Sequence, residues 1–171
     1  ESLRREVPQI ENYFKETQSW LSGKYNGTSC YNKKFIVRSF YNANYLDSFS
    51  QSRPSFENEL FRVATDGSIK DKLEIDLCLD VEVCLIYLKT FRDKKEIKVR
   101  INECIENILD TQMQNGRWDN NLGKTARLLV FFIAHQSQNE FKKKEKEIKE
   151  AISRGITALR NSYQENNWEN N

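Results

Sequence analysis

The sequence contains few of the residues that interrupt helices. Among 171 residues there are only two prolines and six glycines, which permits long helices and disfavours an all-β fold. A single histidine excludes most metal sites that need several histidine ligands. Four cysteines (Cys30, Cys78, Cys84 and Cys104) are too sparse for a small disulfide scaffold, so we expect reduced thiols, most of them buried.

Long apolar runs and an excess of one charge are also missing. No segment approaches the roughly 18 consecutive apolar residues of a transmembrane helix, and no signal peptide is visible. The 27 basic and 25 acidic residues are interspersed, so the sequence gives no support for nucleic-acid binding. We therefore expect a cytoplasmic protein. The chain opens on Glu1 rather than Met, which suggests a fragment of a longer chain.

Apolar residues at spacings of three and four predict an all-α fold. The length fits a single domain, 1–171, with a real core. The predicted helices cover residues 7–21, 33–48, 56–63, 73–91, 97–113, 122–134 and 142–163. Segments 73–91 and 122–134 are apolar almost all round, whereas 97–113 and 142–163 are apolar on one side. This alternation indicates two layers of helices, because enclosed helices contact protein on most sides.

A short pattern returns after the one-sided helices. Gln114, Gly116 and Trp118 form one copy, and Gln164 and Trp168 form a second copy shifted by 50 residues. Repeats of this length are typical of stacked helical hairpins. We expect hairpins at about 1–50, 51–95, 96–137 and 138–171.

An altered copy is suggested earlier, where Gly67 and Ile69 lie 49 positions before Gly116 and Trp118. In such a corner a glutamine amide can bond the backbone at the end of one helix. The tryptophan ring can cover the apolar start of the next helix, and its buried N–H then needs an acceptor. We interpret these residues as structural joints between helices rather than as ligand contacts.

This arrangement resembles the repeats of terpenoid cyclases and protein prenyltransferase β subunits, which form α/α toroids with a Gln…Gly…Trp signature between helices. The resemblance implies an α/α-toroid-like array of helical hairpins. At roughly 50 residues per hairpin the chain supplies fewer hairpins than a complete toroid, so we expect an incomplete or open one. A plain helical bundle without a repeat is the alternative.

The resemblance also suggests where catalytic residues would lie. Class II terpenoid cyclases carry an Asp-x-Asp-Asp motif whose central aspartic acid donates a proton. The nearest match here begins at Asp80, places Glu82 at the proton-donating position and ends on Val83. Asp80 and Glu82 are therefore the implied catalytic residues, although Val83 breaks the acid cluster.

Protein prenyltransferases bind zinc through an aspartate, a cysteine and a histidine. Asp76 and Cys78 have the matching spacing, and His135 is the only histidine. Asp76 and Cys78 stand near the start of one predicted helix and His135 at the end of another, so parallel helices would separate them. We therefore predict neither a resident metal nor a cofactor.

The sequence thus favours a non-catalytic helical-repeat domain that binds a protein partner or an elongated apolar ligand. Aromatic residues could line a concave wall of such a domain or belong to its core: Phe40, Tyr41, Tyr45, Phe131 and Phe132. The alternative is an isoprenoid-processing enzyme, similar to a terpenoid cyclase or a prenyltransferase, or a fragment of one. Whether the protein is an enzyme stays open, and the balance leans against it.

Overall fold

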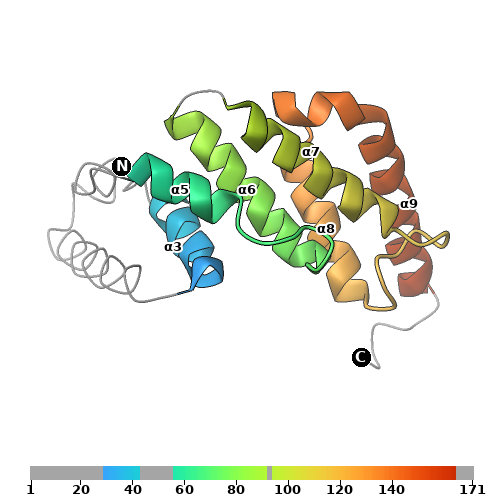
Figure 1. Ribbon diagram of the computed structural model, residues 1–171. Coiled ribbons are helices and arrows are strands. Elements are labelled where there is room, and N and C mark those ends of the chain that lie inside the picture. Colours follow the sequence, from blue (N-terminus) through green and yellow to red (C-terminus); the bar gives the residue numbers. More distant parts are fainter. Residues whose placement is uncertain (1–28, 43–55, 92–93, 165–171) are drawn as a thin grey trace, which may run out of the picture.

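The computed structural model describes residues 29–42, 56–91 and 94–164, and all regular structure in these residues is helical (Figure 1). The prediction of an all-α fold is confirmed for this part of the chain. The helices are α3 (Cys30–Asn42), α5 (Phe56–Ala64), α6 (Glu74–Thr90), α7 (Lys95–Asp110), α8 (Leu122–His135), the 3₁₀-helix η1 (Asn139–Lys144) and α9 (Glu145–Gln164). None of the described helices is both long and apolar enough to cross a bilayer.

The last predicted helix is divided in two. Residues 142–163 were expected to form one helix, but α9 begins only at Glu145 and the turns before it belong to η1. Phe141 in η1 is completely buried, and its ring lies 6.0 Å from that of Phe131. Tight 3₁₀ turns are common where a chain enters a helix, and here they bring an apolar ring to the core before α9 starts.

Three of the helices form a row. α6 contacts α3 on one side and α8 on the other, and α5, α7 and α9 pack against this row (Figure 1). We call α3, α6 and α8 the row, and α5, α7 and α9 the covering helices. Two contacts fix the direction of α6 and α8: Lys124 lies 2.7 Å from Glu74, and His135 lies 3.6 Å from Glu82. Both helices therefore run the same way and begin at the same edge of the molecule.

The burial of each helix follows its sequence pattern. α6, in the middle of the row, is buried on several sides: Leu77, Val81, Val83, Cys84 and Tyr87 are all fully buried. α7 buries a single stripe, made of Ile97, Ile101, Cys104, Ile105 and Ile108, and presents charged residues to water. An all-round apolar helix belongs inside, and a one-sided helix belongs on the outside.

The corner from α7 to α8, residues 111–121, is built around Trp118. The indole is fully buried, donates its Nε1–H to the Ile108 carbonyl oxygen at 2.7 Å and packs against Phe132. The backbone N–H of Trp118 donates to the Thr125 hydroxyl at 3.0 Å. Trp118 thereby connects the end of α7 to α8, through its ring and its backbone, and the indole N–H is satisfied.

The glutamine that joins this corner is Gln112. Its amide nitrogen donates to the carbonyl oxygens of Gly116 and Ala151, both at 2.9 Å, and its oxygen accepts from Arg154. Gln114, which the sequence pattern singled out, is exposed. The bonding amide therefore stands two residues before the expected one and also reaches α9. Gln164, at the end of α9, is exposed, and Trp168 lies outside the described residues.

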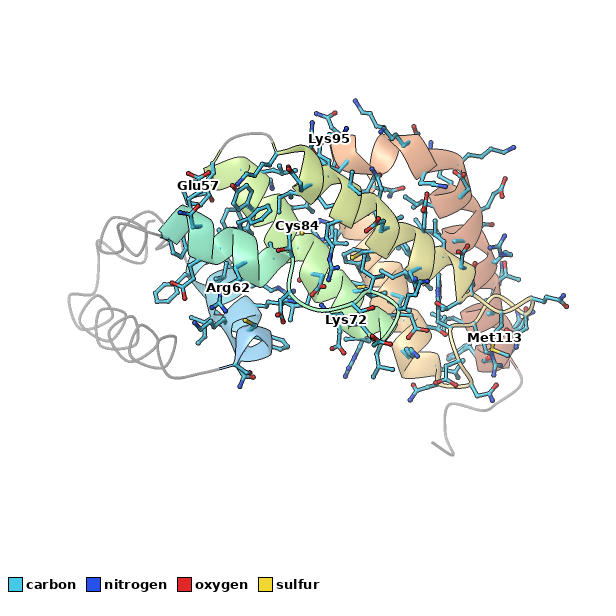
Figure 2. All side chains as sticks on the ribbon, viewed as in Figure 1. Glu57, Arg62, Lys72, Cys84, Lys95 and Met113 are labelled. Atoms are coloured by element: carbon cyan, nitrogen blue, oxygen red, sulfur yellow. The ribbon has the colours of Figure 1, made fainter. Side chains whose placement is uncertain are left out.

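The corner from α5 to α6, residues 65–73, shares one backbone feature with the corner at 111–121. Gly67 has a φ of 75° and Gly116 has a φ of 84°. Both values lie in the left-handed region of backbone conformation, which residues with a Cβ atom rarely adopt. The two glycines are 49 positions apart in the sequence. Both corners lead from a covering helix into a helix of the row, and Figure 2 shows Lys72 and Met113 beside them.

Candidate functional site

A cavity of about 470 Å³ lies between the three helices of the row. All of its lining residues come from α3, α6 and α8. Most of them are apolar: Phe35, Ile75, Leu79, Ala126, Val130, Phe131 and Ala134. On α8 the lining residues run from Ala126 to His135, and nine helical steps correspond to about 13.5 Å. The site is therefore a hollow that is longer than one helical turn and mainly apolar.

One end of the cavity carries a polar cluster on α3, α6 and α8. Arg38 and Glu82 form an ion pair in which Nε lies 3.1 Å from one carboxylate oxygen, and the other carboxylate oxygen lies 3.6 Å from Nε2 of His135. The Glu82 side chain is only 17% exposed, whereas that of Arg38 is 45% exposed. The carboxylate is therefore partly enclosed, while the guanidinium extends toward solvent.

The opposite end of the cavity carries Asp76 and Arg127. Because residue 74 of α6 lies level with residue 124 of α8, these two side chains belong to the edge where both helices begin. Arg127 is exposed, and Val130, one turn further along α8, is 66% exposed. Charged groups thus stand at both ends of the cavity, and apolar groups lie between them.

Asp80, the other implied catalytic residue, lies elsewhere. It is 1% exposed and accepts from three cationic side chains: Lys34 at 2.5 Å, Lys72 at 2.6 Å and Arg100 at 2.9 Å. Lys34 belongs to α3 and Arg100 to α7, so the carboxylate connects three helices and the corner at 65–73. Both oxygens of Asp80 are occupied by these cations, and it does not line the cavity.

The structure therefore does not bring Asp80 and Glu82 together. Residues two apart in a helix point to different sides, and α6 places Glu82 in the cavity and Asp80 among the cations. A proton donor must contact its substrate, so Glu82 is the only one of this pair in a position for such chemistry. The partners of Asp80 come from distant parts of the sequence, and no local pattern predicts them.

The group of charges around Asp80 contains more cations than carboxylates. Burial lowers the pKa of Lys72, and its hydrogen bond to Asp80 opposes this only in part. Lys72 and Arg100 also donate to the backbone oxygen of Asp66, while Nε of Arg100 is buried without a hydrogen-bond partner among the described residues. Buried charge of this kind fixes geometry and makes the loss of any one partner costly.

The three candidate zinc ligands line the same cavity, but Asp76 lies at the end where α6 and α8 begin and His135 lies at the opposite end. His135 lies level with Glu82, which is six residues or about 9 Å along α6 from Asp76. Within the described ranges, no group of three or more His, Cys, Asp or Glu side chains could hold a metal ion. Burial also raises the pKa of the Cys78 thiol.

The aromatic residues of the expected wall divide between cavity and core. Phe131 lines the cavity, whereas Phe40 and Phe132 are buried elsewhere in the core and Tyr41 packs against its edge. Tyr45 lies outside the described residues. Phe35 was not anticipated, but it lies three residues before Arg38, so one face of α3 carries both cavity residues.

Comparison of this chain with protein families, curated proteins and solved structures finds no match.

Proposed function

We propose that this chain is an open, α/α-toroid-like helical domain that binds an elongated apolar ligand in the cavity between α3, α6 and α8. The observation that carries the proposal is the cavity itself, about 470 Å³ with a mainly apolar lining. Ligand sites are commonly hollows of roughly 300–1,000 Å³ with apolar walls and a few polar groups. A small ligand is favoured over a protein partner because the apolar residues line a hollow rather than a flat patch.

The repeat arrangement is supported by corresponding positions along the chain. Gly67 and Gly116 have positive φ and lie 49 residues apart, and each precedes a helix of the row. The covering helices α7 and α9 begin at Lys95 and Glu145, which are 50 residues apart. Parallel α6 and α8, with covering helices against them, are what stacked hairpins require.

The exposed apolar side chains at the cavity supply a driving force for binding. Phe35 is 44% exposed and Val130 is 66% exposed, and both line the cavity. A ligand that removes this surface from water gains roughly 25 cal/mol for each Å² of apolar surface buried. The elongated shape of the hollow favours a chain-like ligand that lies along α8.

The binding test uses an environment-sensitive apolar dye, N-phenyl-naphthylamine, and two matched surface variants. Val130→Arg places a charge in the cavity, and we expect dye affinity to fall about tenfold or more, since 1.4 kcal/mol corresponds to a factor of ten. Ile156→Arg is the control, because Ile156 is 49% exposed on α9 and does not line the cavity. Equal dye binding by the wild type and both variants would rule out this site.

The second candidate function is an isoprenoid-processing activity. The observation that favours it is that Glu82, at the position that corresponds to the proton donor, lines the apolar cavity. The test is incubation with squalene-type and prenyl diphosphate substrates, with and without added zinc or magnesium. A product that disappears in Glu82→Gln would support the activity. Unchanged substrate under all conditions would remove it.

A further inference from the structure

The polar groups of the cavity indicate the chemical class of its ligand, an inference that rests on the proposed function. We propose that the ligand is an uncharged amphiphile, an apolar chain with a polar group that both donates and accepts a hydrogen bond. A long-chain alcohol is the simplest molecule of this class.

The charged side chains that line the cavity include both signs. The cavity carries two arginines, Arg38 and Arg127, and two carboxylates, Asp76 and Glu82. Each end therefore has one guanidinium and one carboxylate, and His135 stands beside the carboxylate of Glu82. Sites for anions usually present a surplus of arginine or lysine, and sites for cations a surplus of carboxylates. A balanced cavity favours neither kind of ion.

Arg38 and Glu82 form an ion pair that leaves further hydrogen-bonding groups on both side chains. Arg38 approaches Glu82 through Nε, and its partly exposed guanidinium has further N–H donors on the two terminal nitrogens. Glu82 has acceptor capacity beyond this one contact. The pair therefore offers a donor and an acceptor side by side at the end of an apolar hollow.

A hydroxyl group matches this pair, since it can donate to Glu82 and accept from Arg38 at once. A carboxylate at the same place would be attracted by Arg38 and repelled by Glu82. An ammonium would be attracted by Glu82 and repelled by Arg38. Attraction and repulsion thus oppose each other for either ion, and the cost of removing a charged headgroup from water remains, so each ionic headgroup binds less tightly than the hydroxyl.

The apolar wall of the cavity has a buried part and an exposed rim. Leu79 and Phe131 lie between the two polar ends and are nearly buried, and Val130 forms the exposed rim. A chain whose hydroxyl lies at Arg38 and Glu82 extends along α8 over these three residues. The apolar part of the ligand then covers apolar surface and leaves the ion pair between Arg38 and Glu82 in place.

The experiment compares n-octanol, octanoate and n-octylammonium, which share one chain and differ in the headgroup. Affinities are measured on the full chain by displacement of N-phenyl-naphthylamine at neutral pH. We expect n-octanol to bind about tenfold more tightly than either ion, which corresponds to about 1.4 kcal/mol. Glu82→Gln should raise the affinity for octanoate about tenfold, and Arg38→Gln should do so for n-octylammonium. Each variant keeps a hydrogen-bonding amide but loses a charge, so the affinity for n-octanol should change less than the affinity for the matching ion.

The outcomes separate this inference from the function on which it rests. Dye binding that is lost in Val130→Arg supports the proposed function. If octanoate or n-octylammonium then binds more tightly than n-octanol, the inference about the headgroup is overturned and the proposed function survives. The same conclusion follows if neither glutamine variant alters the preference among headgroups. If the dye does not bind to the cavity at all, both proposals fail. Circular dichroism and melting curves of each variant establish that the fold is retained.

Discussion

The corner at residues 65–73 and the corner at residues 111–121 each lead from a covering helix to a helix of the row, and each contains a glycine with positive φ. Their closing interactions differ. The corner at 111–121 uses a buried indole and hydrogen bonds from the Gln112 amide. The corner at 65–73 uses charge: Lys72 and Arg100 both donate to the Asp66 carbonyl oxygen and to Asp80.

The difference shows that one backbone turn can be closed by two kinds of chemistry. Packing of Trp118 depends on shape and on the burial of apolar surface, and salt affects it little. The network at Asp80 depends on complementary charge in a buried place, where the removal of one member leaves the others uncompensated. The two corners should therefore respond differently to the same kinds of mutation.

The largest effect is expected from Asp80→Asn, which keeps the shape of the side chain and removes its charge. The three cations around it then lack their carboxylate, and we expect a loss of about 3–5 kcal/mol of unfolding free energy. Addition of Lys72→Met removes one of the stranded charges and should restore about 1–2 kcal/mol. Urea unfolding followed by far-UV circular dichroism measures both changes.

Trp118→Ala provides the comparison for this pair of variants. It should also cost about 3–5 kcal/mol, because a fully buried ring is removed from the core. Lys72→Met in the Trp118→Ala background should restore nothing, since Trp118 contributes no charge. If it restored as much there as with Asp80→Asn, the distinction between the two corners would be wrong.

The next largest difference in unfolding free energy is expected between the alanine variants of Gly67 and Gly116. In Gly116→Ala the new Cβ would lie 2.4 Å from the Arg154 carbonyl oxygen, a backbone atom that cannot easily move. In Gly67→Ala the nearest atom is the flexible end of Lys72, at 3.2 Å. Both variants suffer the penalty for a left-handed residue, about 1–2 kcal/mol, and Gly116→Ala should lose a further ~1–3 kcal/mol. Equal losses in urea unfolding would show that α9 does not approach Gly116 so closely.

A smaller difference in unfolding free energy is expected between the alanine variants of Gln112 and Gln114. Gln112→Ala removes two donated hydrogen bonds and the acceptor of Arg154, and we expect a loss of about 1–2 kcal/mol. Gln114→Ala changes an exposed side chain and should alter stability by less than about 0.5 kcal/mol. If Gln114→Ala lowered the melting temperature more than Gln112→Ala, Gln114 would be the glutamine that stabilises the corner.

The smallest effect concerns the ion pair between Glu74 and Lys124, which connects the first turns of α6 and α8. Burial alone would raise the pKa of Glu74, but the hydrogen bond from Lys124, a backbone hydrogen bond and the charge of Lys124 together bring the pKa below its ordinary value of 4.5. The hydrogen bond to Glu74 raises the pKa of Lys124 above 10.5. Glu74 therefore contributes stability that is present above pH 4.5 and is lost as pH falls through its folded pKa.

We expect Glu74→Gln to cost up to about 1 kcal/mol at neutral pH. The difference from the wild type should shrink below pH 4.5, as the wild-type carboxylate is protonated, and also above pH 10.5, as Lys124 loses its charge. Unfolding free energies measured across this range check both limits. A difference that grows in acid would contradict the assignment.

The positions of most helices could be predicted because periodicity reports which face of a helix is apolar. The boundaries of η1 and α9 could not, since the inward turn of Phe141 depends on the rings that surround it. The sequence pattern does not identify the corner residue Gln112, because spacing alone pairs Gln164 with Gln114. Gln112 is identified by its bond to Ala151, which is 39 residues away in the chain.

The candidate site depended even more on contacts between distant segments. The sequence placed Asp80 and Glu82 in one motif, yet their partners divide them between the buried cations and the cavity. Lys34 and Asp80 are 46 positions apart, and no local pattern connects them. Helical periodicity would separate the two acids, but it does not specify which side faces a cavity.

Local rules were enough to establish an all-α chain, the enclosed nature of α6 and the glycines at two corners. These properties follow from the spacing of apolar residues and from backbone sterics, both of which act over a few residues. Tertiary packing decided which amide closes a corner, which acid is buried among cations and where a hollow remains between α3, α6 and α8. The reason is that hydrogen bonds, charge pairs and cavities are formed by side chains that meet only after the helices have packed.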